Sequence, residues 1–337
     1  MKLNENTTIR DLYDNFDLRA MRGNYISSVN DLWIQSSMSY SLRQIHEQHS
    51  TWGLDDMLYG LRRLERASRA GHPLVFSVYE ENEVVASPDK AQAQMLYLPP
   101  LEEQTGRYAI LLAGGGFGAV CTLPESLPVA ARLNELGYSC FCLNYRTASQ
   151  ESFVHGLLPK PVEDVAAALC LIRENAGRFG LDRDRYLLGG FSAGGFLATL
   201  WGTAHLGARA YGLPQPELLL LDYPLASTRN LPSGPLADYI KTGMYGAGYT
   251  EAEEDRYAVD RHIDGAYPPV YLAAARDDDT VPSKDQNDLK AALENAGIAH
   301  RFEIAEHGGH GFGLGSDTEL AGWVDRALAW MKERYGA

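Results

Sequence analysis

Positive charge is scarce in this sequence, because 30 lysines and arginines stand against 44 aspartates and glutamates, a formal net charge of -14. Nucleic acids and anionic membrane surfaces bind basic faces, so we expect neither as a partner. Long apolar runs are also lacking, since none approaches the roughly 20 residues of a membrane-spanning helix. No apolar stretch typical of a secretory signal follows Met1. We therefore expect a cytoplasmic globular protein that acts on a small molecule.

Cysteine is rare as well. The four cysteines are Cys121, Cys140, Cys142 and Cys170, and no pair has the C-x-x-C spacing of a metal site. Cys140 and Cys142 lie two apart in one apolar segment, which is typical of buried thiols in a strand. Free thiols indicate a reducing compartment, in agreement with the cytoplasm. We expect neither a metal nor an organic cofactor.

Apolar strands and amphipathic helices alternate from Tyr108 onward. This alternation predicts an α/β fold, with a mostly parallel sheet covered by helices on both faces. The expected strands are 109–113, 139–143, 186–188, 218–221, 270–274 and 301–304, and the expected helices are 126–136, 162–175, 196–204, 284–296 and 320–333. We assign residues 101–337 to a catalytic domain of this class.

Residues 1–100 lack the regular alternation of strands and helices and are expected to form an N-terminal extension. They hold a helical period over 54–64 and short strands at 74–79 and 94–98. The extension either covers the site or supplies packing or homo-oligomer contacts. Within the catalytic domain, residues 225–263 are long for a connection and are expected to form a lid. The tyrosines of this insertion either stack on a substrate ring or attach the insertion to the core: Tyr239, Tyr245, Tyr249 and Tyr257.

The most informative motif is Gly190-x-Ser192-x-Gly194, which lies between the expected strand ending at Leu188 and the expected helix from Phe196. This is the nucleophile-elbow pattern, in which a strained turn lifts a serine above the edge of the sheet. Glycines are required on both sides because strand and helix cross too closely for a Cβ. The helix N-terminus adds partial positive charge near the serine. Ser192 is therefore the candidate nucleophile.

A serine nucleophile needs a base and an orienting carboxylate, and in this fold they follow it in the order acid, then histidine. Three adjacent aspartates, Asp277, Asp278 and Asp279, follow the strand at 270–274, and the local sequence does not choose among them. Two histidines follow the last strand. His310 lies between glycines that let the loop curl toward Ser192, whereas His307 abuts the strand end. We therefore favour His310 as the base.

Acyl transfer also requires hydrogen-bond donors for the oxyanion. Gly114-Gly115-Gly116 follows the strand at 109–113, where esterases and lipases carry such a loop. The N–H groups of Gly115, Gly116 and Ala193 are the candidate donors. The loop also fits a loose dinucleotide-binding pattern, Gly114-x-Gly116-x-x-Ala119. That interpretation is weaker, because Pro124 interrupts the following segment and the next strand ends in Asn144 rather than an acid.

Taken together, these residues resemble the α/β-hydrolase fold, and within it the bacterial acetyl esterases that include acetylxylan and feruloyl esterases. The similarity runs from about 108 to 335. It rests on the blocks Gly114–Phe117, Glu125–Ala130, Leu143–Arg146, Pro161 with Asp164, Gly190–Gly195, Asp222–Pro224, Asp278–Pro282 and Gly309–Phe312. The resemblance implies Asp278 as the triad acid, His310 as the base, and Gly115 and Gly116 as oxyanion donors. Ala113 departs from the His or Pro that related esterases often carry before the glycines.

The resemblance implies a serine carboxylic ester hydrolase for short-acyl or aryl esters, such as acetyl or feruloyl esters of sugars. Two alternatives stay open from the sequence. A peptidase or acylaminoacyl hydrolase of the prolyl-oligopeptidase type would use the same triad. A binding protein without catalysis would use the cleft only to hold a ligand.

Overall fold

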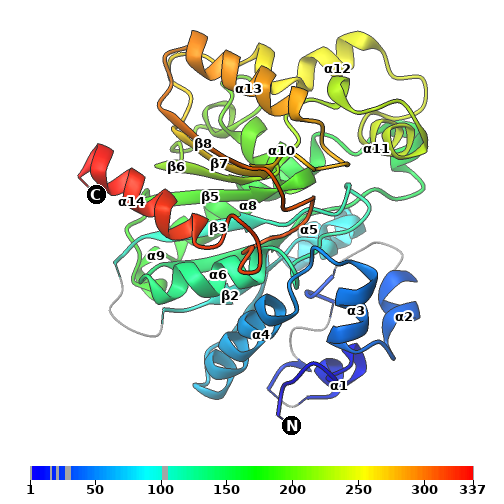
Figure 1. The fold of residues 1–337 in the computed structure, drawn as a ribbon, viewed down its shortest axis with the longest axis vertical. Coiled ribbons are helices and arrows are strands. Elements are labelled where there is room, and N and C mark those ends of the chain that lie inside the picture. Colours follow the sequence, from blue (N-terminus) through cyan, green and yellow to red (C-terminus); the bar gives the residue numbers. More distant parts are fainter. Residues whose placement is uncertain (1, 16, 20–22, 27–31, 101–104, 337) are drawn as a thin grey trace.

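The computed structural model describes residues 2–15, 17–19, 23–26, 32–100 and 105–336. Over these residues the chain builds one eight-stranded sheet in the order β1-β2-β4-β3-β5-β6-β7-β8 (Figure 1). The strands are β1 Val75–Ser77, β2 Gln94–Leu98, β3 Tyr108–Leu112, β4 Ser139–Asn144, β5 Tyr186–Phe191, β6 Leu218–Asp222, β7 Val270–Ala275 and β8 His300–Ala305. Pairing is antiparallel for β1–β2 and β2–β4 and parallel across the rest of the sheet. The expected mostly parallel sheet is confirmed.

Helices cover both faces of the sheet, as predicted. The larger ones are α4 Leu54–Arg69, α6 Ser126–Glu135, α8 Lys160–Glu174, α10 Ser192–Trp201, α11 Pro235–Tyr245, α13 Ser283–Asn295 and α14 Trp323–Tyr335. The shorter ones are α1 Ile9–Asp14, α2 Leu32–Ser37, α3 Leu42–Gln48, α5 Glu81–Ala86, α7 Ser152–His155, α9 Ala176–Phe179 and α12 Glu251–Tyr257. Within the described part of the chain, no helix is both long and apolar enough to span a bilayer.

Alternating side chains of the strands feed two separate apolar cores. In β3, Ile110 and Leu112 pack into the core that includes α8, α10 and α13. Ala109 and Leu111, one position away, pack into the core that includes α4, α6 and α14. Because successive strand residues face opposite ways, a run that is apolar throughout indicates burial on both faces. This explains why the strand 108–112 is apolar at every position.

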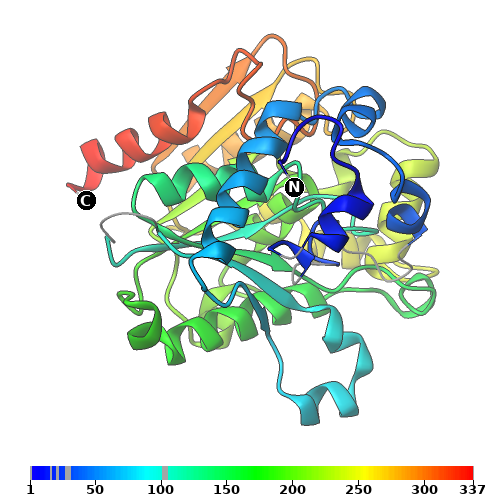
Figure 2. The same cartoon turned by 90° about the horizontal axis from the view of Figure 1, so that it is seen from below.

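Residues 1–100 contribute to both the sheet and the helical layer. β2 pairs with β4 along its whole length, from Gln94 opposite Asn144 to Leu98 opposite Cys140. Helix α4 packs on α6 so closely that a Cβ on Gly60 would lie 2.9 Å from Leu127. The hairpin that carries α5 projects from the rest of the molecule (Figure 2). The division into an extension and a catalytic domain near residue 100 stays a prediction.

Several expected boundaries differ from the structure. Helix α10 begins at Ser192 rather than at the expected Phe196. The expected start was too late because Gly194 and Gly195, which lie in the first turn, have low helix propensity. Helix α14 begins at Trp323 rather than at 320. The polar stretch between β1 and β2 holds α5 and a 3-10 turn. The four cysteines are free thiols, three of them buried.

Candidate functional site

Ser192 lies at the sharp turn between β5 and α10, which begins with it. Its φ of +49° is in the left-handed region that residues with a side chain rarely adopt. The neighbouring glycines allow this turn, because a Cβ on Gly190 would lie 2.5 Å from Gly194 O, and one on Gly194 would overlap Leu112 O. A Cβ on Gly195 would lie 2.6 Å from Pro224 Cβ. The steric reason inferred from the sequence therefore holds at Gly190 and Gly194, and the structure adds Gly195 as a third crowded position.

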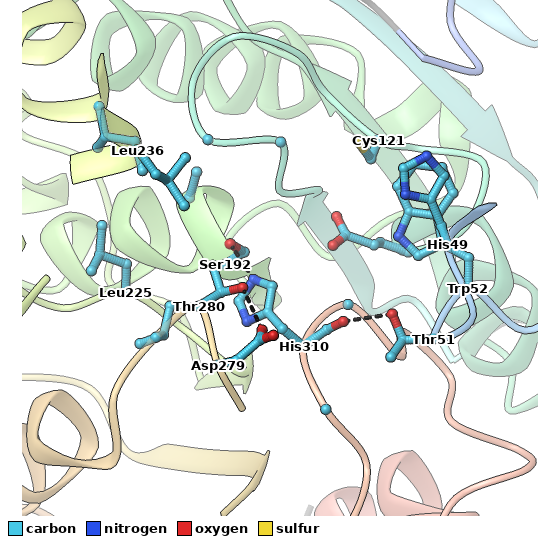
Figure 3. A pocket seen from close by; sticks show the side chains of 18 of the residues that line it. His49, Thr51, Trp52, Cys121, Ser192, Leu225, Leu236, Asp279, Thr280 and His310 are labelled. Carbon is cyan, nitrogen blue, oxygen red and sulfur yellow. Dashed lines mark hydrogen bonds between the residues drawn. The ribbon is translucent and has the colours of Figure 1, made fainter. Parts of the chain in front are cut away.

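Ser192 is joined to His310 and Asp278 by consecutive hydrogen bonds. Ser192 Oγ lies 2.8 Å from His310 Nε2, and His310 Nδ1 lies 2.8 Å from Asp278 Oδ2. A carboxylate can only accept, so His310 Nδ1 carries the proton and Nε2 accepts from the serine hydroxyl. Figure 3 shows Ser192 and His310 facing each other in the middle of a pocket. This arrangement can remove a proton from the serine.

Asp278 is the aspartate of the three that lies beside His310. Its side chain is 1% exposed, and Oδ1 accepts hydrogen bonds of 2.8 Å from the N–H groups of Thr280 and Val281. Asp277 instead accepts hydrogen bonds from the N–H groups of Gly308 and Gly309. These bonds fix the start of the histidine loop, residues 306–312, which carries His310. The sequence predicted neither the position of Asp278 beside His310 nor the hydrogen bonds of Asp277.

The other candidate histidine, His307, and the other two aspartates have different hydrogen-bond partners. His307 Nδ1 is 3.3 Å from Asp277 Oδ2, and its side chain is 79% exposed. Hydrogen bonding to Gly309 and Gly308 and the contact with His307 keep the pKa of Asp277 below its ordinary value. Asp279 Oδ1 accepts from the hydroxyl of Thr280. Neither Asp277 nor Asp279 bonds to His310.

Gly115, Gly116 and Ala193 all line the pocket next to Ser192. In the described part of the chain their N–H groups donate no hydrogen bond, so they are available to an incoming oxygen. The loop needs glycine: Gly115 has φ of +127° and Gly116 of +59°, and a Cβ on Gly114 would lie 2.7 Å from Ser192 Cβ. No helix opens at these glycines, since α6 begins only at Ser126. This disfavours the dinucleotide-binding alternative.

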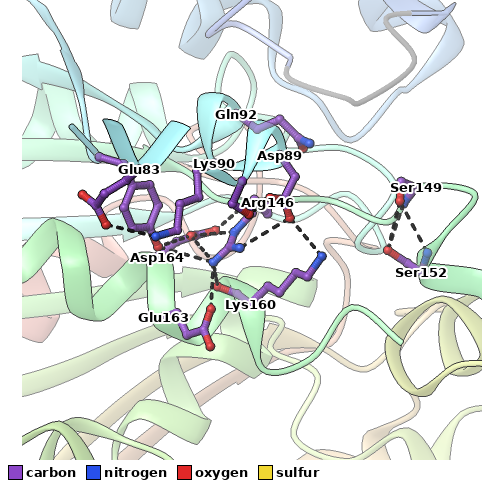
Figure 4. A network of polar contacts seen from close by, with 12 residues as sticks. Glu83, Asp89, Lys90, Gln92, Arg146, Ser149, Ser152, Lys160, Glu163 and Asp164 are labelled. Atoms are coloured by element: carbon purple, nitrogen blue, oxygen red, sulfur yellow. Dashed lines mark hydrogen bonds and ion pairs between the residues drawn. The ribbon is translucent and has the colours of Figure 1, made fainter. Parts of the chain in front are cut away.

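A network of ion pairs surrounds the buried side chain of Arg146, next to the segment that follows β4 (Figure 4). Arg146 follows β4, is 3% exposed, and donates to both carboxylate oxygens of Asp164 on α8 at 2.7 and 2.8 Å. Arg146 also forms ion pairs with Glu163 and with Asp89, which lies in the hairpin that carries α5. Two residues further on, Ala148 N–H donates to Phe117 O at 2.7 Å. The segment after β4 is thereby fixed, and it holds the loop that carries Gly115 and Gly116.

Glu125 is a buried residue, 3% exposed, whose carboxyl group lines the pocket. It accepts hydrogen bonds from the N–H of Gly114 and from the hydroxyl of Tyr223, which in turn accepts from the N–H of Gly313. The side chain thus connects the loop of Gly114–Gly116 to the loop that carries His310. Burial raises the pKa of Glu125 to about 7. Sequence reasoning included Glu125 only as part of a family block.

The pocket encloses about 550 Å³ and has two different walls. One is aliphatic and comes from the 225–263 insertion, where Leu225, Leu231, Leu236 and Ile240 line it together with Tyr239. The opposite wall comes from residues 48–52, with His49 and Trp52. Figure 3 shows Ser192 between Leu225 and Leu236 on one side and His49 and Trp52 on the other. Of the insertion's tyrosines, Tyr239 reaches the pocket, whereas Tyr245 and Tyr257 are buried.

The sequence analysis left open that residues 1–100 cover the site, but it did not identify the residues of the wall at 48–52. Helix α3, which leads into it, carries a capping box between Ser41 and Gln44, a local pattern that could have predicted the helix. No local pattern indicates that Thr51 lies against His310, because the two are distant in the sequence. Among the described residues, no group of three or more histidine, cysteine or acidic side chains is arranged to hold a metal ion.

Comparison with known proteins agrees with this architecture. The BD-FAE family model matches residues 95–210. Endo-1,4-beta-xylanase B of Butyrivibrio fibrisolvens is 25% identical over 73% of this chain. An acetylxylan esterase of Xylanibacter ruminicola is 28% identical over 68%. The chain spans only 39% and 45% of the lengths of these two relatives.

Two solved structures share the fold. An acetyl ester-xyloside bifunctional hydrolase from Caldicellulosiruptor lactoaceticus has a TM-score of 0.66 at 25% identity, covering 78% of this chain and 96% of that one. A carboxylesterase from Lactobacillus plantarum has a TM-score of 0.59 at 23% identity, covering 72% and 92%. The α/β-hydrolase fold predicted from the sequence is therefore confirmed, as is the likeness to bacterial esterases.

Proposed function

We propose that this chain, an α/β-hydrolase with bacterial acetylxylan esterase and carboxylesterase relatives, is a serine carboxylic ester hydrolase. The observation that carries the proposal is the pair of 2.8 Å contacts joining Ser192 to His310 and His310 to Asp278. Gly115, Gly116 and Ala193 line the same pocket as the serine, and their N–H groups donate no hydrogen bond to any residue that the structure describes. A nucleophile, a base, an orienting acid and oxyanion donors are the parts that acyl transfer requires.

In the proposed reaction Ser192 Oγ attacks the ester carbonyl carbon while His310 Nε2 takes its proton. The negative charge that develops on the carbonyl oxygen is stabilised by the N–H groups of Gly115, Gly116 and Ala193 and by the positive end of α10. The carboxylate of Asp278 stabilises the imidazolium. His310 then gives the proton to the leaving alcohol oxygen, and an acyl-enzyme remains. Water then gives a proton to His310 as its oxygen attacks the acyl carbon, and His310 passes that proton to Ser192 Oγ as the acid is released.

The substrate class we propose is esters with a short acyl group or an aryl group, with acetyl or feruloyl esters of sugars as the natural type. The pocket of about 550 Å³ has room for a small ester but not for a polymer chain within it. The relatives named as acetylxylan esterase and acetyl ester-xyloside hydrolase support short acyl groups on sugars.

The test is hydrolysis of p-nitrophenyl esters from acetyl to decanoyl by wild type and by Ser192→Ala, with aminoacyl-arylamides as the amide arm. We expect rapid turnover of the acetyl and butyryl esters that the variant loses. Turnover of the amides alone would replace the proposal with the peptidase alternative. A folded wild type that turns over neither class, yet binds them, would favour the non-catalytic alternative.

A further inference from the structure

The wall at residues 48–52 is built from two stacked rings. The ring centroids of His49 and Trp52 are 4.2 Å apart, with 25° between the ring planes. Burial lowers the pKa of His49, which favours the uncharged imidazole ring. Both rings line the pocket that holds Ser192. They provide a flat, largely apolar surface, whereas the opposite wall is mostly aliphatic apart from Tyr239.

This wall is held rigidly. His49 caps the end of α3 through its N–H to Ile45 O, and Trp52 N–H donates to His49 O at 2.8 Å. His46 Nδ1 lies 2.8 Å from Trp52 O. On the far side of the turn, Asp56 in α4 accepts a hydrogen bond from Ser316 N–H. The turn is thus fixed at both ends, which is what a preorganised binding surface requires.

The wall also lies directly against the histidine loop. Thr51 Oγ1 donates a 2.6 Å hydrogen bond to His310 O. A Cβ on Gly309 would lie 2.9 Å from Thr51 Cγ2, and one on Gly311 would lie 3.3 Å from Trp52 Nε1. In the proposed reaction the leaving alcohol oxygen must reach His310 Nε2 to take its proton. The alcohol portion of the ester therefore lies on the side of His310, toward the two rings.

We propose that His49 and Trp52 form a subsite that binds a ring in the alcohol portion of the ester. The inference rests on the proposed esterase function and adds the specificity of the leaving group. The ligand chemistry is a ring with a flat apolar face, which an aryl alcohol or a pyranose supplies. Trp52 is the specificity-determining residue, and it lies outside residues 95–210 that the family model matches.

The experiment compares kcat/KM of wild type and Trp52→Ala on phenyl acetate, ethyl acetate and methyl benzoate. Hydrolysis is measured by the release of protons. Phenyl acetate places its ring in the alcohol portion and methyl benzoate in the acyl portion. We expect Trp52→Ala to lower the phenyl acetate to ethyl acetate ratio about fivefold, the loss of one aromatic stacking contact. Trp52→Phe should restore most of that ratio. Leu236→Ala, on the opposite wall, should change it less than twofold.

An equal loss on all three esters would overturn the proposal, because it would mean that Trp52 only supports the fold. A loss confined to methyl benzoate would also overturn it, by assigning the ring to the acyl portion. A mono-acetylated methyl xyloside added to the series distinguishes the two sources of the ring. If Trp52→Ala lowers kcat/KM for the xyloside alone, the subsite binds a pyranose. If it lowers kcat/KM for phenyl acetate alone, the subsite binds an aryl alcohol.

If wild type hydrolyses none of these esters, the proposed function fails, and binding becomes the measure of the subsite. Calorimetric titration of Ser192→Ala and of the double variant with Trp52→Ala, using phenyl acetate, then answers the question. Binding that the double variant loses supports the ring subsite without catalysis. Equal binding by both, or none by either, overturns it.

Discussion

The hydroxyl of Thr51 donates a 2.6 Å hydrogen bond to the backbone carbonyl of His310, across 259 positions of sequence. This bond joins the turn before α4 to the loop that carries the proposed base. It restrains the backbone of His310, whose two ring nitrogens face Ser192 and Asp278. Residues before the family-matched segment therefore take part in positioning the site.

Replacing Thr51 by Val should lower kcat on p-nitrophenyl acetate about fivefold, because a neutral hydrogen bond contributes about 1 kcal/mol and its loss loosens His310. Thr51→Ser keeps the hydroxyl and should retain most of the activity. Steady-state kinetics at pH 7.5 are the measurement. Unchanged kcat in Thr51→Val would mean that Asp278 and the glycines hold His310 unaided.

Asp278→Asn should reduce kcat by a factor of about 10³ to 10⁴, since an amide favours the wrong imidazole tautomer. Asp277→Asn is the matched control, because Asp277 bonds to Gly308 and Gly309 and not to His310. We expect that control to lose far less activity in the same p-nitrophenyl acetate assay. A larger loss in Asp277→Asn than in Asp278→Asn would reassign the acid.

Glu125 should make stability depend on pH. Its pKa is raised from 4.5 to about 7 in the folded protein, so the folded state holds this proton more tightly than the unfolded state. The resulting stabilisation is complete below about pH 4.5 and is lost as pH rises through about 7. Glu125→Gln lacks this contribution. The free energy of unfolding of wild type, minus that of the variant, should fall by on the order of 3 kcal/mol between pH 4.5 and 8.

Urea unfolding of both proteins at several pH values measures that difference. Buried acids whose pKa does not depend on Glu125, such as Asp285, contribute equally to wild type and variant and cancel. A difference that stays constant with pH would show that Glu125 ionises at its ordinary value.

Gly194→Ala should destabilise the protein by more than about 2 kcal/mol, because the new Cβ overlaps the backbone of β3. Gly177→Ala is the matched control, since a Cβ there meets nothing within 4 Å and its φ is ordinary. The control should be neutral or stabilised by up to about 1 kcal/mol. Thermal unfolding of the two variants compares them, and equal midpoints would contradict the steric account of the elbow.

The fold was largely predictable because its signals are local. Strands such as 108–112 are apolar at every position, since they are buried on both faces, and this pattern needs no knowledge of partners. Ser192 was predictable for a similar reason, because the turn around it demands glycines at fixed positions. The start of α10 was not predictable, since glycines in its first turn have low helix propensity and hide the helical pattern.

The rest of the site depends on contacts between distant segments. The local sequence could not choose Asp278 over Asp277, because the choice depends on which carboxylate reaches His310 in three dimensions. His49 and Trp52 show no local sign of lining a pocket, as their surroundings read as an ordinary polar turn. Their place is set by the packing of α4 on α6 and by Thr51 on the histidine loop.

The contact between Thr51 and His310 also has a consequence for how activity appears during folding. Closing a loop of this length costs more entropy than forming a helix or pairing neighbouring strands, so such contacts tend to form late. We therefore expect the wall at 48–52 to meet the histidine loop only after both have docked on the sheet. On refolding from denaturant, helical signal should therefore return before esterase turnover, and the lag between them reports the docking of these two segments.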